Sequence, residues 1–196
     1  MRVDRGGPVG ILALQGDFAA HGRAVEEAGH RPRPVRRAGE LEGLAALILP
    51  GGESTTMLKL LRGDGLREGI EDFARAGGPI LATCAGVVLL ARTVVNPEQE
   101  SLDLLDLDVY RMGYGRQVHS TIHTLPGPPG LGPIEAVFIR APRITRVGRQ
   151  VEVLAALEED PVLVRQGAIV ATTFHPELAR ENRVHSWFLE GVAGVE

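Results

Sequence analysis

Apolar runs alternate with amphipathic stretches along the first half of the chain. Three short runs are almost unbroken, as expected for strands that are buried on both faces: residues 9–14, 44–49 and 79–83. The stretches that follow have apolar residues at helical spacing, or are apolar throughout, and predict four helices: residues 18–28, 53–61, 66–76 and 85–91. Residues 33–36 read as an edge strand, where Pro34 would be tolerated. Elements in this order predict a parallel sheet with helices on both faces.

The second half of the chain has shorter apolar runs separated by turn residues. They predict hairpins or added strands: residues 104–109, 136–139, 151–157, 162–165 and 168–172. A closing helix is expected over residues 184–192, and the proline- and glycine-rich residues 126–130 read as a loop. Too little chain flanks that loop for separate cores, so we expect one domain over residues 1–196, with residues 1–8 as an N-terminal extension. The predicted fold class is α/β, with three layers: a mostly parallel central sheet, helices on both faces, and added antiparallel strands.

Composition narrows the classes of partner. The chain has 196 residues, of which 44% are hydrophobic and 23% charged, which is an ordinary globular balance. Its net charge is −4 and its basic residues form no long run, which argues against a nucleic-acid partner. A single cysteine excludes an intramolecular disulfide and suits a reducing compartment. No apolar run approaches the length of a membrane span and no secretory signal is recognisable, so we expect a cytoplasmic protein without a membrane partner.

Cys84 is the first candidate for chemistry. It lies between a predicted buried strand and a predicted buried helix, in the small-residue segment Ala82-Thr83-Cys84-Ala85-Gly86. A nucleophile elbow requires this arrangement, because a sharp turn from strand to helix lifts the side chain above the sheet and small neighbours let the turn close. The helix N-terminus that follows favours negative charge on the sulfur. Taken alone, however, a lone cysteine is more often a buried structural residue.

The segment Thr173-Phe174-His175-Pro176-Glu177 follows the last predicted strand and is the second candidate. A cysteine nucleophile needs a base for its proton, and the base needs an acceptor that fixes its tautomer. His175 and Glu177 supply both, although a solvated loop is the alternative for the tripeptide alone. Open parallel sheets collect their active sites at the carboxyl ends of their strands, and both candidates follow strands that could share that edge.

The third candidate is the glycine loop Pro50-Gly51-Gly52-Glu53-Ser54-Thr55-Thr56. It does not match the phosphate-binding Walker pattern, because no Gly-Lys-Ser/Thr follows the glycines. The better interpretation is an oxyanion hole, in which the N–H of Gly52 faces that of Ala85, the residue after the cysteine. The alternative is a simple turn in which a polar residue of this loop caps the helix, and capping is expected in either case.

The other histidines give weaker signals. His119 and His123 would lie well apart on a strand, and with no spare thiol or acidic cluster nearby we expect no metal site. His21, His30 and His185 read as ordinary helix or loop positions.

Together these motifs resemble those of the class I, triad-type glutamine amidotransferases. More narrowly, six segments in order along nearly the whole chain are similar to the glutaminase subunits of pyridoxal 5'-phosphate synthase: Leu12-Ala13-Leu14-Gln15-Gly16, Pro50-Gly51-Gly52-Glu53-Ser54-Thr55-Thr56-Met57, Thr83-Cys84-Ala85-Gly86, Gly115-Arg116-Gln117, Phe138-Ile139-Arg140-Ala141-Pro142 and Phe174-His175-Pro176-Glu177-Leu178. The second and fifth segments are specific to this subunit. Ala82, Met112 and residues 119–121 depart from the family's usual residues, but none of them removes a catalytic group. The resemblance implies a flavodoxin-like sheet.

The resemblance also implies catalytic roles. Cys84 would attack the side-chain carboxamide carbon of glutamine, His175 would move the protons, and Glu177 would orient His175. Backbone groups of Gly52 and Ala85 would form the oxyanion hole.

Ligands and partners follow from the same resemblance. L-Glutamine would be bound by residues from three loops: Gly52, Glu53, Ser54, Arg111, Ile139 and Arg140. Gln15 falls where the family places a residue at the oxyanion region and the partner interface. The partner would be a (β/α)8-barrel synthase that builds pyridoxal 5'-phosphate from a pentose phosphate, a triose phosphate and the released ammonia, in a large hetero-oligomer. No cofactor is implied, because pyridoxal 5'-phosphate is the product of the complex.

Two other interpretations remain open. The chain could be the glutaminase subunit of another amidotransferase, such as the one that makes imidazole glycerol phosphate; residues 138–142 argue against it. It could also be a non-glutaminase protein with the same cysteine elbow, such as a chaperone or redox sensor. Such proteins lack a late His-x-Glu, so residues 174–177 argue against this class.

Overall fold

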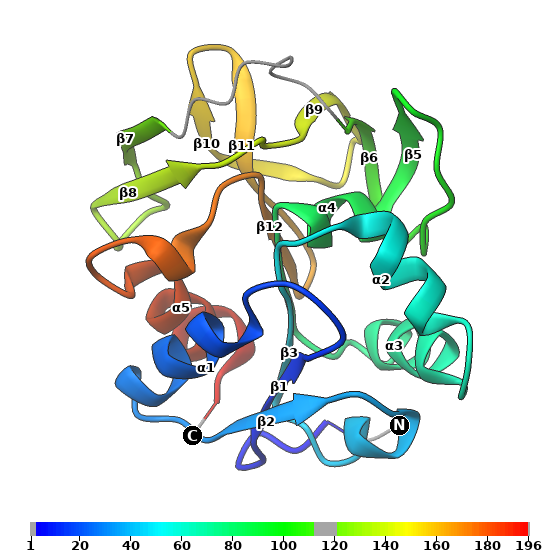
Figure 1. Cartoon of the computed structure of the whole chain (residues 1–196). Coiled ribbons are helices and arrows are strands. Elements are labelled where there is room, and N and C mark those ends of the chain that lie inside the picture. The colour runs from blue at the N-terminus through cyan, green and yellow to red at the C-terminus, as the bar shows by residue number, and fades with distance from the viewer. Residues whose placement is uncertain (1–2, 112–120, 196) are drawn as a thin grey trace.

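The structure is a computed structural model that describes residues 3–111 and 121–195 (Figure 1). The expectations that concern Met112, His119 and residues 115–117 lie outside these ranges. Within them, no helix combines the length and the apolar character that crossing a membrane would require.

Seven strands form the central sheet. Five of them are parallel neighbours, in the order β12 (Ile169–Thr172), β4 (Ile80–Thr83), β3 (Ala46–Leu49), β1 (Val9–Leu12) and β2 (Pro32–Val35). Beyond β12 the sheet continues with two antiparallel strands, β11 (Asp160–Gln166) and β10 (Glu152–Leu157). The proline-containing strand β2 lies at the opposite edge, where its missing N–H donors cost no ladder hydrogen bonds. The predicted parallel sheet with added antiparallel strands is therefore confirmed.

Helices cover both faces of this sheet, and Figure 1 shows them on its left and right. One face carries α1 (Phe18–Glu27) and the closing helix, which is α5 (Arg183–Ser186) followed by π-helical residues (Trp187–Ala193). The other face carries α2 (Ser54–Leu61), α3 (Leu66–Arg75) and α4 (Ala85–Leu90). Two 3-10 turns complete the helical elements: η1 (Ala38–Leu41) and η2 (Pro176–Leu178).

The two apolar cores follow from the alternation of side chains along each strand. On β4, Leu81 packs on the face of α1 and the closing helix, with Val25 and Phe188. Its neighbour Ile80 packs on the opposite face, with Phe73 of α3. Because β4 is buried on both faces, its sequence is a continuous apolar run, and the three-layer prediction is confirmed.

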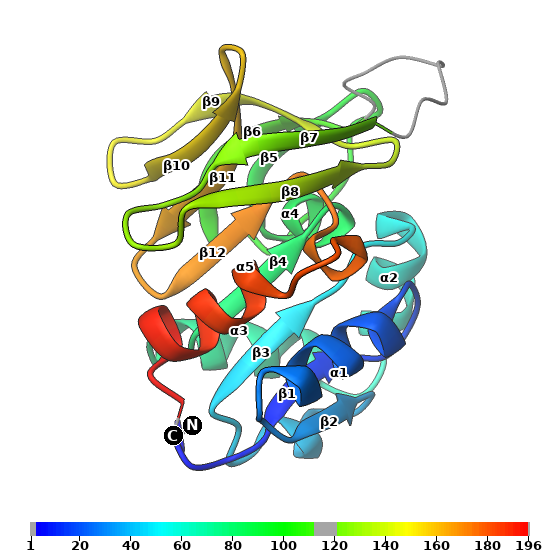
Figure 2. The same cartoon turned by 90° about the vertical axis from the view of Figure 1, so that its left-hand side faces the viewer.

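Five further strands gather at the end of the molecule where β3 and β4 terminate (Figures 1 and 2). They form a three-stranded sheet and a hairpin: β5 (Ala91–Val95), β6 (Leu105–Tyr110) and β9 (Arg143–Val147), and β7 (Thr121–Pro126) with β8 (Pro133–Phe138). The sequence analysis did not predict β5, β7 and β9. Most side chains of β7 are exposed and β5 buries only its first and fourth residues, so neither has the apolar pattern of a buried strand.

Candidate active site

Four neighbouring parallel strands end at one edge of the sheet, and the segments that follow them bring the candidate residues together. Gln15 follows β1, the glycine loop follows β3, Cys84 follows β4, and His175 follows β12. Because these strands run in the same direction and are adjacent, their carboxyl ends share one edge. This edge places residues that lie about 90 positions apart in sequence within contact distance.

Cys84 occupies the sharp turn between β4 and α4. Its backbone has φ +46° and ψ −102°, a strained conformation for a residue with a side chain, and its N–H donates to the carbonyl of Thr172 on β12 at 2.8 Å. Gly86 lets α4 approach β3, because a Cβ at this position would lie 2.4 Å from the carbonyl oxygen of Leu49. The cysteine is thus held in an elbow that is tied to the strand leading to His175.

His175 and Cys84 both lie next to Gly51. A Cβ at Gly51 would lie 2.4 Å from Cε1 of His175 and 3.3 Å from Cβ of Cys84. Nδ1 of His175 lies 2.7 Å from Oε1 of Glu177, which leaves Nε2 of the ring for the cysteine. The three residues therefore have the contacts that a nucleophile, a base and an orienting carboxylate require.

The electrostatic environment favours a charged pair of His175 and Glu177. Burial opposes protonation of His175, but hydrogen bonds with Cys84 and Glu177 outweigh it and raise the pKa of His175 to about 10. Burial also disfavours ionisation of Glu177, but hydrogen bonds from His175 and His21 hold the pKa of this carboxyl well below its usual range. Glu177 is thus an ionised acceptor that stabilises the imidazolium form of His175.

The loops after β1 and β3 are locked together. The side-chain oxygen of Gln15 accepts a hydrogen bond from the backbone N–H of Glu53 at 2.6 Å. Gly16 has φ +95°, and a Cβ there would lie only 1.8 Å from the carbonyl oxygen of Gly51, so this close approach requires glycine. Gly52, with φ +152°, lies between these contacts. The oxyanion roles of Gly52 and Ala85 stay predictions.

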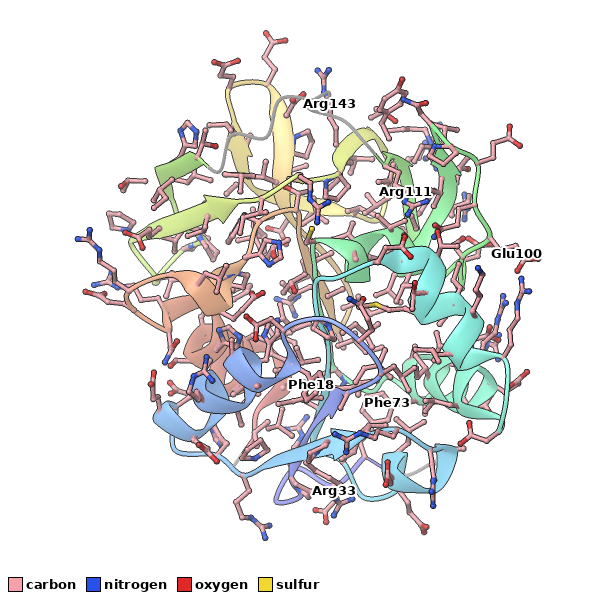
Figure 3. All side chains as sticks on the ribbon, viewed as in Figure 1. Phe18, Arg33, Phe73, Glu100, Arg111 and Arg143 are labelled. Atoms are coloured by element: carbon pink, nitrogen blue, oxygen red, sulfur yellow. The ribbon has the colours of Figure 1, made fainter. Side chains whose placement is uncertain are left out.

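Three of the expected glutamine-binding residues form one cluster at the start of α2. Glu53 caps this helix by accepting from the N–H groups of Thr55 and Thr56. Burial acts to raise the pKa of Glu53, but the hydroxyl of Thr56 and these two N–H groups donate to the carboxylate and lower its pKa to about 2. Arg111, which is labelled in Figure 3, forms an ion pair with Glu53. The buried Ser54 donates its hydroxyl to Gln99 at 2.9 Å. A carboxylate and a guanidinium thus lie side by side near the glycine loop.

Two more of the expected glutamine-binding residues, Ile139 and Arg140, directly follow β8. The N–H of His175 donates to the carbonyl of Val137 at 2.8 Å, so Ile139 and Arg140 follow a strand that contacts the base. Arg140 is exposed and has φ +46°. Among the described residues, no hydrogen bond or ion pair joins Arg140 to the cluster at the start of α2.

Two residues of the site were missed by the sequence analysis. His21 of α1 and His185 of α5 are fully buried, and His21 contacts Glu177 from the side opposite His175. The sequence analysis interpreted both as ordinary helix or loop positions, and the only signal was their apolar surroundings. In the part of the chain that the structure describes, no three His, Cys, Asp or Glu side chains are grouped so as to hold a metal ion.

Comparisons with known proteins show the family of this chain. The chain is 51% identical over 187 residues to the pyridoxal 5'-phosphate synthase subunit PdxT of Solibacter usitatus, which covers 92% of this chain and 97% of that protein. It is 50% identical over 191 residues to the subunit of the same name from Thermus thermophilus, with 96% and 99% covered. A crystal structure of a glutamine amidotransferase superposes with a TM-score of 0.91 at 48% identity, and covers 96% of this chain and 100% of that one. A model of the SNO glutamine amidotransferase family matches residues 11–194, and the chain belongs to this family.

Proposed function

We propose that this chain hydrolyses L-glutamine to L-glutamate and ammonia, as the glutaminase subunit of a pyridoxal 5'-phosphate synthase. One observation carries the proposal: His175, which is bound to Glu177 at 2.7 Å, shares Gly51 as a neighbour with Cys84. Relatives about half identical to this chain carry the name of that synthase's subunit, which supports this assignment over another amidotransferase. The lone thiol suits the reducing cytoplasm.

The reaction begins with acylation of the cysteine. The sulfur of Cys84 attacks the side-chain carboxamide carbon of glutamine, and His175 takes up the thiol proton. His175 then donates this proton to the departing nitrogen, so that the C–N bond breaks, ammonia leaves and a glutamyl thioester remains. The raised pKa of His175 favours the imidazolium that exists between the two proton transfers, and Glu177 stabilises it.

Hydrolysis of the thioester completes the cycle. His175 removes a proton from water, the oxygen attacks the thioester carbon, and the C–S bond breaks as His175 returns the proton to the sulfur. In both steps the carbonyl oxygen becomes negatively charged, and the N–H groups of Gly52 and Ala85 would bind it. One such donor stabilises the transition state by about 3–4 kcal/mol. Side chains and water supply the chemistry, and pyridoxal 5'-phosphate is the product of the complex.

Recognition of a free amino acid requires partners for an ammonium and a carboxylate. Glu53 is ionised at neutral pH, since its pKa is lowered to about 2, and suits the α-ammonium group. Arg111, which pairs with Glu53, suits the α-carboxylate because a guanidinium can bind it through two hydrogen bonds. Gly52, Ser54, Ile139 and Arg140 would complete the pocket.

The proposed partner is a (β/α)8-barrel synthase subunit in a large hetero-oligomer. The hydrogen bond from Glu53 to Gln15 supports a role for docking, because a partner that moves Gln15 would also move the glycine loop. An enclosed route between the subunits would keep ammonia from water.

A glutamate-release assay tests the proposal. We expect the wild-type chain to release glutamate from glutamine when the cognate pyridoxal 5'-phosphate synthase barrel is present, and Cys84→Ala to release none while retaining its circular dichroism spectrum. The barrel subunit of an imidazole glycerol phosphate synthase serves as the comparison partner. If only the barrel of the imidazole glycerol phosphate synthase stimulated glutamate release, the chain would be a subunit of that enzyme instead. Undiminished release by Cys84→Ala would show that Cys84 is not the nucleophile.

A further inference from the structure

A row of buried polar side chains continues from Glu177 away from the active-site cysteine. Oε2 of Glu177 lies 3.4 Å from Nε2 of His21, and Nδ1 of His21 lies 2.9 Å from Nε2 of His185. Nε2 of His21 also lies 3.2 Å from the hydroxyl of Thr83. The side chains of Glu177 and His21 have no solvent exposure, and His185 is equally buried. Two histidines are thus placed in the interior at an energetic cost that an apolar pair would not have.

These contacts come from four separate parts of the fold. His21 lies on α1, His185 on α5, Glu177 on η2, and Thr83 is the last residue of β4, directly before Cys84. α1 packs against both η2 and α5. His21 therefore contacts the carboxylate of the triad and the residue that leads into the nucleophile, so it bridges the two arms that carry Cys84 and His175.

The contacts are consistent with one arrangement of protons. The hydroxyl of Thr83 accepts a hydrogen on Nε2 of His21, and Oε2 of Glu177, a buried oxygen without another hydrogen-bond partner among the described residues, lies 3.4 Å from the same nitrogen. With its hydrogen on Nε2, His21 offers Nδ1 as an acceptor, and His185 donates to it through Nε2. Nδ1 of His185 is left as an acceptor, and it is a buried atom without a hydrogen-bond partner among the described residues. The donor of His185 is thus directed at His21, and the donor of His21 at Thr83 and the carboxylate of Glu177.

We propose that His21 is a positioning residue of the glutaminase site, and that His185 orients it. The imidazole of His21 holds the second oxygen of Glu177, which keeps the first oxygen directed at His175. Through Thr83 it also fixes the carboxylate relative to the elbow of Cys84. The inference rests on the proposed function, because it assigns a role within that reaction.

Nuclear magnetic resonance of the full chain tests the arrangement without glutamine. Nitrogen-15 shifts of the imidazole rings distinguish the two neutral tautomers, and single histidine substitutions assign the signals. We expect the ring of His21 to carry a hydrogen on Nε2, and His185, whose pKa is lowered by burial, to be neutral at pH 7 with its hydrogen on Nε2. A His21 ring with its hydrogen on Nδ1 would overturn the proposal, because it could not then donate to Glu177.

Kinetics of the complex with the cognate synthase test the consequence for catalysis. His21→Leu keeps the bulk but removes the donor, and we expect kcat for glutamate release to fall about 10- to 100-fold, the effect of losing a hydrogen bond to a charged group. KM for glutamine should change little, since His21 does not face the substrate cluster. His21→Gln, whose amide can again donate to Glu177, should restore most of kcat. His30→Leu, at a histidine just beyond the end of α1, is the matched control.

The pH profile separates positioning from a purely structural role. Facing His21 are Glu177 from η2, His185 from α5 and the uncharged Thr83 from β4. Without its donor, Glu177 should ionise at higher pH, so the acid limb of the kcat profile should move towards neutrality in His21→Leu and return in His21→Gln. A fall in kcat with no shift, or equal losses in both variants, would overturn the proposal. If the wild-type complex released no glutamate, the proposed function would be wrong. The nuclear magnetic resonance measurement would still test the hydrogen positions on His21 and His185, because it needs no activity.

Discussion

The side chain of Gln15 and the backbone of Glu53 are joined by a hydrogen bond of 2.6 Å, which connects the loops that follow β1 and β3. Gly52, the expected oxyanion residue, directly precedes the donor of this bond. The position of the glycine loop therefore depends on a side chain from a different strand. The surroundings of Glu177, Gly51 and His185 likewise predict how substitutions there change turnover or stability.

Substitution of Gln15 should weaken partner-stimulated turnover more than folding. Gln15→Ala removes the acceptor for the N–H of Glu53, and we expect about a tenfold loss of kcat at saturating synthase, the effect of about one hydrogen bond. Gln166→Ala is the matched control, because Gln166 also accepts from a backbone N–H, that of Asp106 on β6. Unchanged turnover at saturating partner would contradict the role of Gln15.

Replacement of the triad carboxylate should have a much larger effect. In Glu177→Gln the amide can donate to Nδ1 of His175, which holds the ring in the tautomer that cannot accept the thiol proton. We expect kcat to fall on the order of 10³-fold or more, as for comparable carboxylate-to-amide changes in catalytic triads. Steady-state glutamate release measures the loss, with the exposed Glu190→Gln as a control. A loss below tenfold would show that Glu177 does not set the tautomer.

Gly51 is expected to tolerate no side chain. The Cβ of Gly51→Ala would lie 2.4 Å from the ring of His175 and 3.3 Å from the Cβ of Cys84, so the ring must move. Because a misplaced catalytic group can cost about 100-fold in rate, kcat should fall by that order. Gly63→Ala is the control, since a Cβ there meets nothing within 4 Å. Comparable activity of the two variants would show that the ring is free to shift.

Acidification should destabilise the fold through His185. Burial lowers the pKa of His185 to about 3, whereas the unfolded chain has the ordinary value of 6.5. Between these values the unfolded chain binds a proton that the folded chain does not, so the free energy of unfolding falls as the pH falls, by up to about 1.4 kcal/mol per pH unit. Urea unfolding between pH 7 and pH 5 should therefore show a smaller pH dependence in His185→Gln. This range avoids Glu177, which acts in the same direction only below its unfolded pKa of 4.5. If the free energy of unfolding had the same pH dependence in the wild type and in His185→Gln, the lowered pKa of His185 would be refuted.

The elements of the central sheet could be predicted because each carries a local pattern. β4 is a continuous apolar run, and α4 is apolar on every side, since both are buried on all faces. β5 and β7 lack such a pattern, because β5 buries only its first and fourth residues and most side chains of β7 are exposed. β7 is held by its pairing with β8. Such pairing depends on the surroundings of a strand more than on its own residues, so the sequence of β7 alone does not indicate it.

The candidate chemistry divides in the same way. Cys84 and the His-x-Glu segment were recognisable because catalysis demands particular residue types at strand ends. Arg111 and Glu53 were expected to bind the same ligand, but their ion pair depends on how the segment after β6 lies over α2. The sequence gives no sign that His21 and His185 belong together, because they are 164 residues apart and each resembles an ordinary core residue of its own helix.

The sequence by itself determined the strands and helices of the central sheet, the candidate nucleophile and the family that the motifs resemble, because these depend on local patterns and residue types. The tertiary structure alone decided that the cysteine and its base both pack against Gly51, that Gln15 holds the glycine loop, and that His21, in contact with His185, lies beside Glu177. Such contacts form only when the carboxyl ends of the parallel strands are aligned and the helices pack against the sheet. They join residues that are far apart in the sequence, so no local pattern of residues indicates them.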